Sequence, residues 1–575
     1  GDKSYKEALK AMQTRHLETL RILVPAAEQS PLLVKLKVWF NNLEDVLHGV
    51  FLVGECSLRC LDYVMSFGEL FSACILSEAL RAAGLEAEFL DAREVLVSDQ
   101  HFGTGHVDFE RTNHNIVTYC AERQALQIIT GFIATTTGGE TITLGRGGSD
   151  YSASIFGAAL NADEIEIWTD VDGVMSADPR KVKKAFPQAR LTYEEAMELS
   201  HFGAKVIFPP TMQPALEKRI PIRIRNTVNP GFEGTLIHCA PDSGSSPARS
   251  RPTVATGISS IEKISLVRVE GSGMVGVAGI AMRLFGAIAQ AQINIILITQ
   301  ASSEHTICLA VRPEDAPTVK SLVEDEFALE IQAKLINDAL VEDGFSIVSV
   351  VGENMRSSPG TAGRVFSALG KNGVNVAAIA QGSSELNISA VVPQGDEVKA
   401  LNALHEEFFF PDNKLINMFL VGTGLIGGAL IKQLQAHYKK LKECYAHEVR
   451  LIGVANSRRM LVSEEGLPPE DCLALLEQSG EPCNIDSLLK QFRALNLPNS
   501  ILVDCTASED LAKRYEEILK SSISIVTPNK KAQSGALDYY TRIKRAASHR
   551  GAVLLFETSV GAGLPVLSTL NDLIK

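Results

Sequence analysis

The residues with the clearest potential for chemistry lie within residues 143–180. A glycine turn at 145–148 carries one cation, Arg146, and Ser149 and Asp150 follow directly. Glycines let backbone N–H groups approach a phosphate closely, and the start of a helix behind them adds a favourable dipole. Asp150 can hold a metal or orient a nucleophile, and Arg146 can form paired hydrogen bonds with a carboxylate or phosphate. These groups fit phosphoryl transfer. The alternative is an ordinary glycine-rich turn with a solvated aspartate.

A second polar group follows the apolar segment 165–168, which is typical of a short strand. Thr169, Asp170 and Asp172 come directly after it. Open α/β sheets bind ligands at the carboxyl ends of their strands. We therefore expect these side chains to lie beside a bound ligand.

A third motif, G-x-G-x-x-G, begins at Gly422, after the apolar strand 418–421 and before a helix over 429–438. This context is the one that a dinucleotide fingerprint requires. No acid follows the next strand, 449–454, but two arginines do, and they can bind a 2′-phosphate. The pattern favours NADP(H) over NAD(H), with a solvated arginine pair as the alternative. The predicted cofactor residues are Gly422, Gly424, Leu425, Ile426, Gly427, Arg458 and Arg459.

The chain that positions these motifs has 575 residues, so we expect about four domains. A formal charge of −13 argues against a nucleic-acid partner. No apolar run reaches the ~18 residues that a membrane span needs, and the N-terminus has no apolar signal region. The ten cysteines are scattered, which indicates reduced thiols. His101 and His106 lie five residues apart, and we expect them to be solvated rather than metal ligands.

Apolar periodicity predicts the other elements. Residues 1–45 have helical spacing. Residues 49–69 predict a strand, a loop and then a helix that begins at Ser66, and residues 71–84 continue as an amphipathic helix. Residues 127–135 predict one apolar strand, and residues 194–205 predict a helix.

Four blocks, LGRGGSD, WTDVDGV, DPR and EAMELSHFGAK, occur in this order. Together they resemble the aspartate kinase branch of the amino-acid kinase family over residues 30–240. The resemblance implies ATP with Mg²⁺ as the phosphoryl donor and L-aspartate as the acceptor, giving 4-phospho-L-aspartate. Members of that branch begin with a strand that carries Lys-Phe-Gly-Gly-Thr. No such motif occurs here, so we expect that strand to be missing from the sequence.

The same resemblance implies roles for single residues. Arg146 would grip a substrate carboxylate, and Asp150 would orient or stabilise the reacting centre. Glu69 would hold the aspartate; its alternative role is an acid that favours a helix dipole. The other implied residues are Ser149 for the substrate, and Thr169, Asp170, Arg180 and Lys205 for the nucleotide.

Two copies of one pattern follow residue 260. Each copy predicts a strand, a glycine-rich turn, an amphipathic helix and a strand that ends in Gln-x-Ser-Ser-Glu, which makes Gln300 and Gln381 equivalent. A glutamine there can bind a ligand's carboxylate or side chain; the alternative is an edge residue bonded to water. The pair resembles ACT domains, regulatory modules that bind amino acids. This resemblance implies L-threonine as the effector.

TPNKK at 527–531 and ETSVGAGLP at 557–565 resemble homoserine dehydrogenase, which interconverts aspartate semialdehyde and L-homoserine. Lys530 would contact cofactor and substrate, and Thr506 and Ala507 would lie near the nicotinamide. The second motif offers oxygen ligands for a hard monovalent cation, sodium in that family; the alternative is a glycine-rich connector. The implied sodium ligands are Glu557, Val560, Ala562 and Leu564.

The prediction is an α/β chain with an amino-acid kinase-like α/β sandwich, two ferredoxin-like ACT repeats and a Rossmann dinucleotide-binding domain. The expected boundaries are 1–242 for the kinase domain, 243–259 for a linker, 260–341 and 342–410 for the repeats, and 411–575 for the Rossmann domain. The substrate domain of the dehydrogenase is expected to be missing after residue 575.

The predicted function is a bifunctional aspartate kinase and homoserine dehydrogenase, regulated by threonine. We expect a homo-oligomer, a dimer or tetramer, in the cytoplasm, or in a plastid if the source is a plant. One alternative is an amino-acid sensor with vestigial catalytic ends. Another is a lysine-regulated aspartokinase fused to an unrelated Rossmann module.

Overall fold

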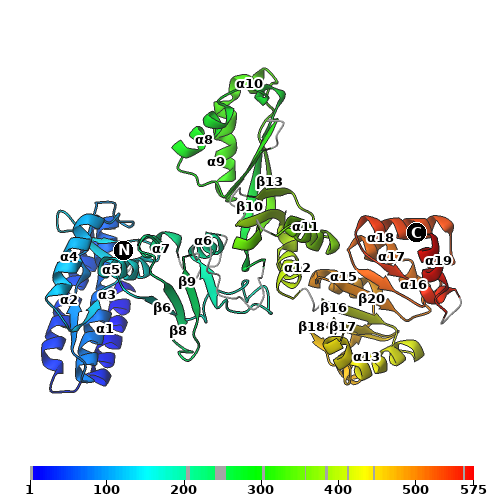
Figure 1. Cartoon of the computed structure of the whole chain (residues 1–575), viewed down its shortest axis with the longest axis horizontal. Coiled ribbons are helices and arrows are strands. Elements are labelled where there is room, and N and C mark those ends of the chain that lie inside the picture. The colour runs from blue at the N-terminus through cyan, green and yellow to red at the C-terminus, as the bar shows by residue number, and fades with distance from the viewer. Residues whose placement is uncertain are drawn as a thin grey trace. The chain divides into compact units, whose positions relative to one another are not determined.

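The computed structural model describes residues 4–201, 208–239, 254–300, 305–355, 358–381, 386–410, 414–444, 447–560 and 564–574. It divides into two compact units (Figure 1). The first holds residues 1–174 and 187–247, and the second holds residues 175–186 and 248–575. The predicted mixture of helices and strands is confirmed.

Helices and short sheets alternate in the first unit. The sheets have the orders β1-β3, β2-β4-β5 and β6-β8-β9-β7. The helices are α1 (Ser4–Leu23), α2 (Gln29–Val53), α3 (Leu58–Ala82), α4 (Phe109–Ala121), α5 (Gly148–Leu160), α6 (Tyr193–His201) and α7 (Pro209–Glu217). The strands are β1 (Ala87–Leu90), β2 (Val97–Ser98), β3 (Leu126–Ile129), β4 (Ile133–Thr136), β5 (Thr141–Thr143), β6 (Ile165–Thr169), β7 (Arg190–Thr192), β8 (Ile222–Asn226) and β9 (Thr235–His238).

The strand predicted within residues 49–69 is wrong, because α2 continues to Val53 and α3 begins at Leu58. Gly54 ends α2 at a φ of 74°, and the Ser57 side chain accepts a hydrogen bond from the Cys60 N–H as the N-cap of α3. A short apolar run does not distinguish a strand from a buried helix, whereas a Gly and a Ser at these spacings are helix stop and start signals.

Two further predictions change. The single strand predicted over 127–135 is two strands, β3 and β4, separated at Phe132, whose φ is 67°.

We expected no apolar stretch long enough to cross a membrane, yet among the described helices α3 has the length and composition to do so. Half of its most apolar window is buried, and Phe67, Leu70 and Phe71 belong to the core of the first unit. This is the environment of a core helix.

The repeat module, residues 254–410, forms one six-stranded antiparallel sheet in the order β11-β12-β10-β13-β15-β14. Two long strands, β10 and β13, run side by side through it (Figure 1), so both repeats share them. The first three residues of β10 lie in the predicted linker, 243–259. The elements are β10 (Gly257–Glu270), α8 (Ile280–Gln290), β11 (Leu297–Gln300), β12 (Thr306–Val311), α9 (Ala316–Glu326), α10 (Ala328–Gln332), β13 (Leu340–Val351), α11 (Thr361–Lys371), β14 (Ala378–Gln381), β15 (Asn387–Pro393) and α12 (Glu397–Phe409).

The C-terminal module, residues 414–574, has a seven-stranded sheet in the order β19-β18-β17-β16-β20-β21-β22. Its parallel strands β17, β16, β20, β21 and β22 give the topology expected of a Rossmann domain. The strands are β16 (Lys414–Val421), β17 (His447–Ala455), β18 (Arg459–Leu467), β19 (Glu481–Pro482), β20 (Ser500–Asp504), β21 (Ser524–Val526) and β22 (Leu554–Leu555). The helices are α13 (Leu425–Cys444), α14 (Cys472–Ser479), α15 (Ile485–Leu495), α16 (Glu509–Ala512), α17 (Tyr515–Lys520), α18 (Leu537–His549) and α19 (Val566–Ile574).

Residues 175–186 interrupt the first unit in sequence but pack on the repeat module. The Ile258 N–H donates to the Ser176 carbonyl at 2.8 Å, and the Ser176 hydroxyl lies 2.9 Å from Nε2 of His405 on α12. The Lys181 ammonium donates to Oε1 of Glu397 at 2.5 Å. The second unit thus includes a segment of the kinase-like sequence.

Burial gives two neighbours on α12 opposite pKa shifts. It lowers the pKa of His405 from 6.5 to about 4, assisted by the charge of Lys184. It raises the pKa of Glu406 from 4.5 to about 7. Unfolding lets His405 take up a proton as the pH falls, and it lets Glu406 release one as the pH rises. Acid therefore weakens the contribution of His405 to stability, and base weakens that of Glu406.

We predict that two variants separate these effects between pH 4.5 and 6.5. In His405→Gln the free energy needed to open α12 should decrease as the pH rises, because of these two residues only Glu406 is left to titrate. In Glu406→Gln it should increase with pH, each change reaching about 3 kcal/mol at most. Native-state hydrogen exchange of the α12 amides measures both. Parallel pH profiles in the two variants would contradict the assignment.

Candidate active sites

The glycine turn between β5 and α5 requires glycine at several positions. Gly145 and Gly147 have φ values of 75° and 67°, and a Cβ on Gly148 would lie 2.6 Å from Cδ2 of Phe132. Gly147 is the residue that precedes the first turn of α5. A helix therefore starts directly behind a left-handed glycine, which suits the binding of an anion.

Arg146 and Asp150 form no ion pair with any residue that the structure describes. Arg146 is exposed, and its guanidinium lies 5.7 Å from the centre of the Phe208 ring. Asp150 is half-buried, and burial raises the pKa of its carboxyl. A half-buried carboxylate is costly unless a cation or hydrogen-bond donor compensates it. Both side chains are thus available to a ligand at this turn.

Glu69 and Ser149 both lie next to Gly131. Burial raises the pKa of Glu69. A hydrogen bond from the backbone N–H of Gly131 to its carboxylate offsets part of this shift. A Cβ on Gly131 would lie 3.1 Å from both Cβ and Oγ of Ser149. The fold therefore brings together two predicted substrate residues that are 80 positions apart in the sequence.

The sequence analysis missed Asp62, a positioning residue on α3. Its side chain is 1% exposed. One oxygen accepts a hydrogen bond from the Thr143 hydroxyl at 2.7 Å, and the other accepts one from the Gly103 N–H at 2.8 Å. Asp62 thereby fixes the end of β5, which leads into the glycine turn. The signal was an acid between the apolar residues Leu61 and Tyr63.

The predicted nucleotide residues differ in their surroundings. Thr169 ends β6, and its hydroxyl donates to the exposed Asp170 at 3.2 Å. Asp172 accepts hydrogen bonds from the amides of Asn226 and Asn229, so it positions the loop after β8. Arg180 belongs to the second unit, where its exposed guanidinium forms two hydrogen bonds with Asp178. Lys205 lies outside the described residues.

The fingerprint glycines of the C-terminal module occupy the switch point beside β16, whose neighbours are β17 and β20. A Cβ on Gly422 would lie 2.8 Å from the Cys505 carbonyl, and one on Gly427 would lie 1.9 Å from the Gly422 oxygen. A Cβ on Gly424 would meet nothing within 4 Å. Leu425 and Ile426 are exposed at the start of α13. The first and third glycines thus allow close packing, and the second faces open space that suits a pyrophosphate.

The two arginines predicted to bind a 2′-phosphate lie on the tight turn after β17. The Asn456 side chain accepts hydrogen bonds from the backbone N–H groups of Arg458 and Arg459. The Arg459 guanidinium donates to the Gly480 carbonyl at 3.2 Å. Arg458 is exposed and has no side-chain partner among the described residues. Arg458 is therefore the better placed of the two for a phosphate.

A second buried acid, Asp504, positions the other side of this crevice. It is fully buried, and one oxygen accepts hydrogen bonds from the N–H and hydroxyl of Thr506. The other accepts hydrogen bonds from the Tyr515 hydroxyl at 2.7 Å and the Asn529 amide at 3.0 Å. Ala507 and Lys530 are exposed on the loops that these bonds fix. The sequence analysis missed this role, although an acid that ends an apolar strand was the signal.

The predicted sodium ligands are placed differently. The Glu557 carboxylate accepts hydrogen bonds from the backbone N–H groups of Leu567 and Ser568, and so it caps α19. Val560 and Leu564 are exposed, and Ala562 lies outside the described residues. The one carboxylate of the set thus already binds a helix N-terminus.

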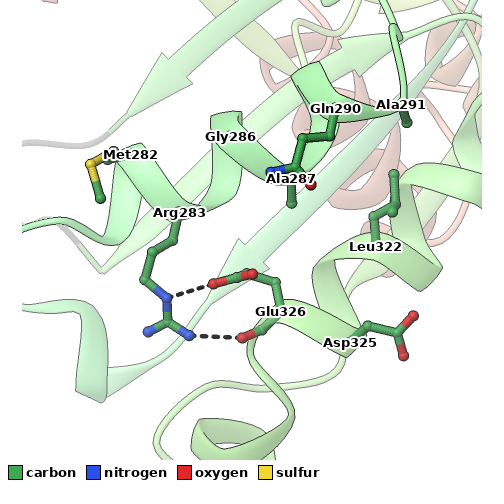
Figure 2. Close-up of a pocket in the computed structure, with 9 residues that line it drawn as sticks. All are labelled: Met282, Arg283, Gly286, Ala287, Gln290, Ala291, Leu322, Asp325 and Glu326. Carbon is green, nitrogen blue, oxygen red and sulfur yellow. Dashed lines mark hydrogen bonds and ion pairs between the residues drawn. The ribbon is translucent and has the colours of Figure 1, made fainter.

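The first repeat has two cavities that differ in chemistry. One, of about 560 Å³, lies between α8 and α9 (Figure 2). Its cation, Arg283, is bound to Glu326 there and also to Glu330. The other, of about 370 Å³, is lined by residues 276–281, at the start of α8, and by Gln300. Gln300 thus lies beside a helix N-terminus, where a carboxylate is stabilised. Gln381 ends β14 and is exposed, and β14 contacts β11.

These features define a class of protein: an α/β chain with a glycine turn at the start of a helix, a pair of regulatory-type repeats that share one sheet, and a Rossmann-type sheet. Comparison with family models gives the same division. A model of the amino acid kinase family matches residues 6–226, and a model of the ACT domain matches residues 267–327 and 348–408. A model of the homoserine dehydrogenase NAD binding domain matches residues 422–557.

Comparison with similar proteins narrows this class to one family. Aspartokinase 1, chloroplastic, from Arabidopsis thaliana is 32% identical over 69% of this chain and 68% of its own length. The solved structure of E. coli aspartokinase III in complex with aspartate and ADP matches with a TM-score of 0.59 and 27% identity, over 71% of this chain and 88% of that one. The chain belongs to the aspartokinase family.

Within that family the whole chain matches one kind of member. Bifunctional aspartokinase/homoserine dehydrogenase 2, chloroplastic, from Arabidopsis thaliana is 38% identical over all of this chain. The chain spans 63% of that relative's length, which is less than two thirds.

The geometry of the fingerprint predicts different effects for two Gly→Ala substitutions. Gly424→Ala should keep the melting temperature within about 2 °C, because its Cβ meets open space. It should weaken the binding of a nicotinamide dinucleotide by about tenfold or more, because that space is where the pyrophosphate would lie. Gly427→Ala should lower the melting temperature by several degrees. Calorimetric titration and thermal unfolding measure these effects; unchanged cofactor affinity in Gly424→Ala would contradict the placement.

Proposed function

We propose that the first unit transfers the γ-phosphoryl group of ATP, bound with Mg²⁺, to the β-carboxylate of L-aspartate, forming 4-phospho-L-aspartate. The observation that supports this most directly is the meeting of Glu69 and Ser149 at Gly131, next to the left-handed turn that presents Arg146. A substrate with an ammonium and two carboxylates needs one acid and at least one cation in its site. Family membership adds support, because one solved relative is described in complex with aspartate and ADP.

The residues divide the work of phosphoryl transfer as follows. Arg146 holds a carboxylate of aspartate through paired hydrogen bonds. Glu69 holds the α-ammonium, and Ser149 donates to the substrate. Asp150 orients the reacting centre. Thr169 and Asp170 hold the nucleotide, and the turn with the first turn of α5 receives its phosphates. The nucleotide roles of Arg180, which belongs to the second unit, and of Lys205, which lies outside the described residues, stay predictions from the resemblance.

The C-terminal module, in this proposal, binds NADP(H) and serves the interconversion of aspartate semialdehyde and L-homoserine. Gly424 leaves room for the pyrophosphate, and Arg458 receives the 2′-phosphate. Lys530 stands on a loop that Asp504 positions through Asn529. In this proposal its ammonium is the contact to cofactor and substrate. The protein supplies orientation and electrostatics, while the nicotinamide carries the hydride. The predicted sodium site combines the Glu557 carboxylate with backbone oxygens of Val560, Ala562 and Leu564, and Glu557 could join it only by leaving the start of α19.

The repeat module senses threonine as a feedback effector. The cavity at Gln300 offers an amide side chain and a helix N-terminus to an amino acid, and Gln381 is its counterpart in the second repeat. The functional protein is a homo-oligomer, a dimer or tetramer. The plant relatives are named as chloroplastic, and we propose a plastid location if the source is a plant and a cytoplasmic one otherwise.

The test is ATP-dependent formation of aspartyl hydroxamate by the protein expressed from its complete reading frame. Arg146→Gln should reduce the rate by about 100-fold or more, because a preorganised charge contact to the reacting substrate is lost. The melting temperature should not change, since Arg146 is exposed. Arg111→Gln, which removes an exposed arginine of the same unit, is the matched control. A full rate in Arg146→Gln, or no hydroxamate from the unaltered protein, would overturn the proposal.

A further inference from the structure

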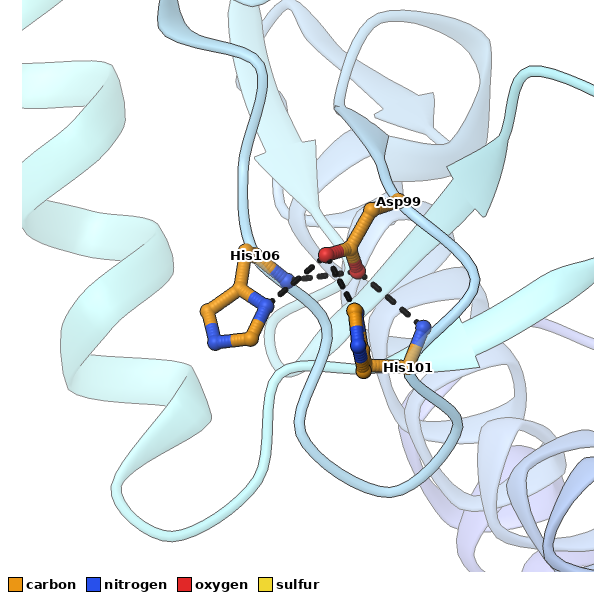
Figure 3. A group of neighbouring side chains, drawn as sticks. All are labelled: Asp99, His101 and His106. Atoms are coloured by element: carbon orange, nitrogen blue, oxygen red, sulfur yellow. Dashed lines mark hydrogen bonds and ion pairs between the residues drawn. The ribbon is translucent and has the colours of Figure 1, made fainter.

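The loop between β2 and α4 brings together three side chains of types that can bind a metal, Asp99, His101 and His106 (Figure 3). The ring nitrogen Nδ1 of His101 lies 2.6 Å from Oδ2 of Asp99, and Nδ1 of His106 lies 2.8 Å from the same oxygen. The ligand atoms of all three residues lie within 4.8 Å of one another. We expected the two histidines to be solvated; both are exposed, and they also converge on one carboxylate.

The carboxylate of Asp99 is held in this orientation by the backbone. Its other oxygen, Oδ1, accepts hydrogen bonds from the N–H groups of His101 and His106, both at 3.1 Å. One oxygen is thus used by the main chain, and the second faces the two imidazoles. Backbone bonds of this kind orient a ligating carboxylate and raise the affinity of a site.

The loop itself is closed at both ends. At its base, the Asp99 N–H and the Ser98 hydroxyl each donate to the His106 carbonyl at 3.0 Å. At its tip, the Gly103 N–H donates to Asp62, and the Gly105 N–H donates to the Thr143 carbonyl at 2.9 Å. The two histidines therefore stand on opposite arms of a loop whose backbone is already fixed by hydrogen bonds. Binding of an ion would need to order only the two histidine side chains.

The donor set selects a class of ion. Two imidazoles and one carboxylate suit Zn²⁺ and similar transition metals, whereas Mg²⁺ and Ca²⁺ prefer oxygen ligands only. Tetrahedral ligands about 2.0–2.1 Å from Zn²⁺ are about 3.3 Å apart. The observed separations of 2.6 and 2.8 Å need to open by about 0.7 and 0.5 Å, respectively. Rotation of the two imidazoles, which are 71% and 73% exposed, supplies this movement.

We propose that Asp99, His101 and His106 form a binding site for a divalent transition-metal ion, Zn²⁺ being the best match, with a fourth position open to solvent. The ion joins the two arms of the loop in place of the shared hydrogen bonds. The Gly103 carbonyl lies 3.1 Å from the position of a Cβ on Gly145, so the fixed loop packs against the residue that precedes Arg146. This proposal does not depend on the phosphoryl-transfer function.

The test is calorimetric titration of the full chain with ZnCl₂ at pH 7.5, after its thiols have been alkylated so that cysteines do not compete. The expected result is one site per chain with a dissociation constant in the range of about 1–50 µM. Affinity should fall at least tenfold in His101→Gln and in His106→Gln. It should be unchanged in His114→Gln, an exposed histidine on α4 that lies outside the cluster. MgCl₂ should give no such binding.

Two further measurements, the pH dependence of Zn²⁺ affinity and the visible spectrum with Co²⁺, test the proposed ligands. Affinity should fall as the pH drops from 7.5 to 5.5, because protons compete for the imidazoles. Co²⁺ in place of Zn²⁺ should give the weak visible bands of nitrogen and oxygen ligation in the unaltered chain, and lose them in Asp99→Asn. Binding that survives both histidine substitutions, or no binding at 1 mM ZnCl₂, would overturn the proposal.

Discussion

The ion pair between Lys181 and Glu397 is the constraint on which the packing of residues 175–186 against the repeat module depends. Glu397 is buried, and its two oxygens also accept hydrogen bonds from the hydroxyls of Ser260 and Ser346, both at 2.7 Å. Lys181 is the cation that compensates this carboxylate, and it pairs with Glu262 as well. A buried carboxylate that loses its cation is strongly unfavourable. Residues 175–186 must therefore pack on the repeat module for that module to be stable.

This constraint connects two functions through the covalent chain. The docked segment carries Arg180, a proposed nucleotide residue, and its Ser176 carbonyl accepts a hydrogen bond from Ile258 on the shared strand β10. Ala177 and Val182 belong to the apolar core of the second repeat. A change in the repeat sheet would thus act directly on residues that continue into the first unit. Such a route is what feedback by a bound amino acid requires, because an effector acts only through the difference between two arrangements.

The features that could be predicted from the sequence are those that depend on residues close together in the chain. The fold class and the family are confirmed, because both depend on motifs of a few neighbouring residues such as the dinucleotide fingerprint and the glycine turn at Arg146. The binding roles of Arg146, Gln300 and Gln381 stay predictions. The residues that hold the sites together were missed, because their contacts are far apart in sequence: Asp62 binds Gly103 and Thr143, and Asp504 binds Asn529. Both are acids that follow apolar residues, and the sequence does not show which distant groups they bind. The error at residues 49–69 has another cause, since an apolar run of five residues fits a strand and a helix equally well.

The central claim is that residues 175–186 respond as part of the repeat module. The most direct measurement is hydrogen–deuterium exchange of the protein from its complete reading frame, with and without saturating threonine, the proposed effector. The account predicts that amides of residues 175–186 change their exchange together with those of β10 and α12. Changed exchange in β10 and α12 with residues 175–186 unaffected would contradict it.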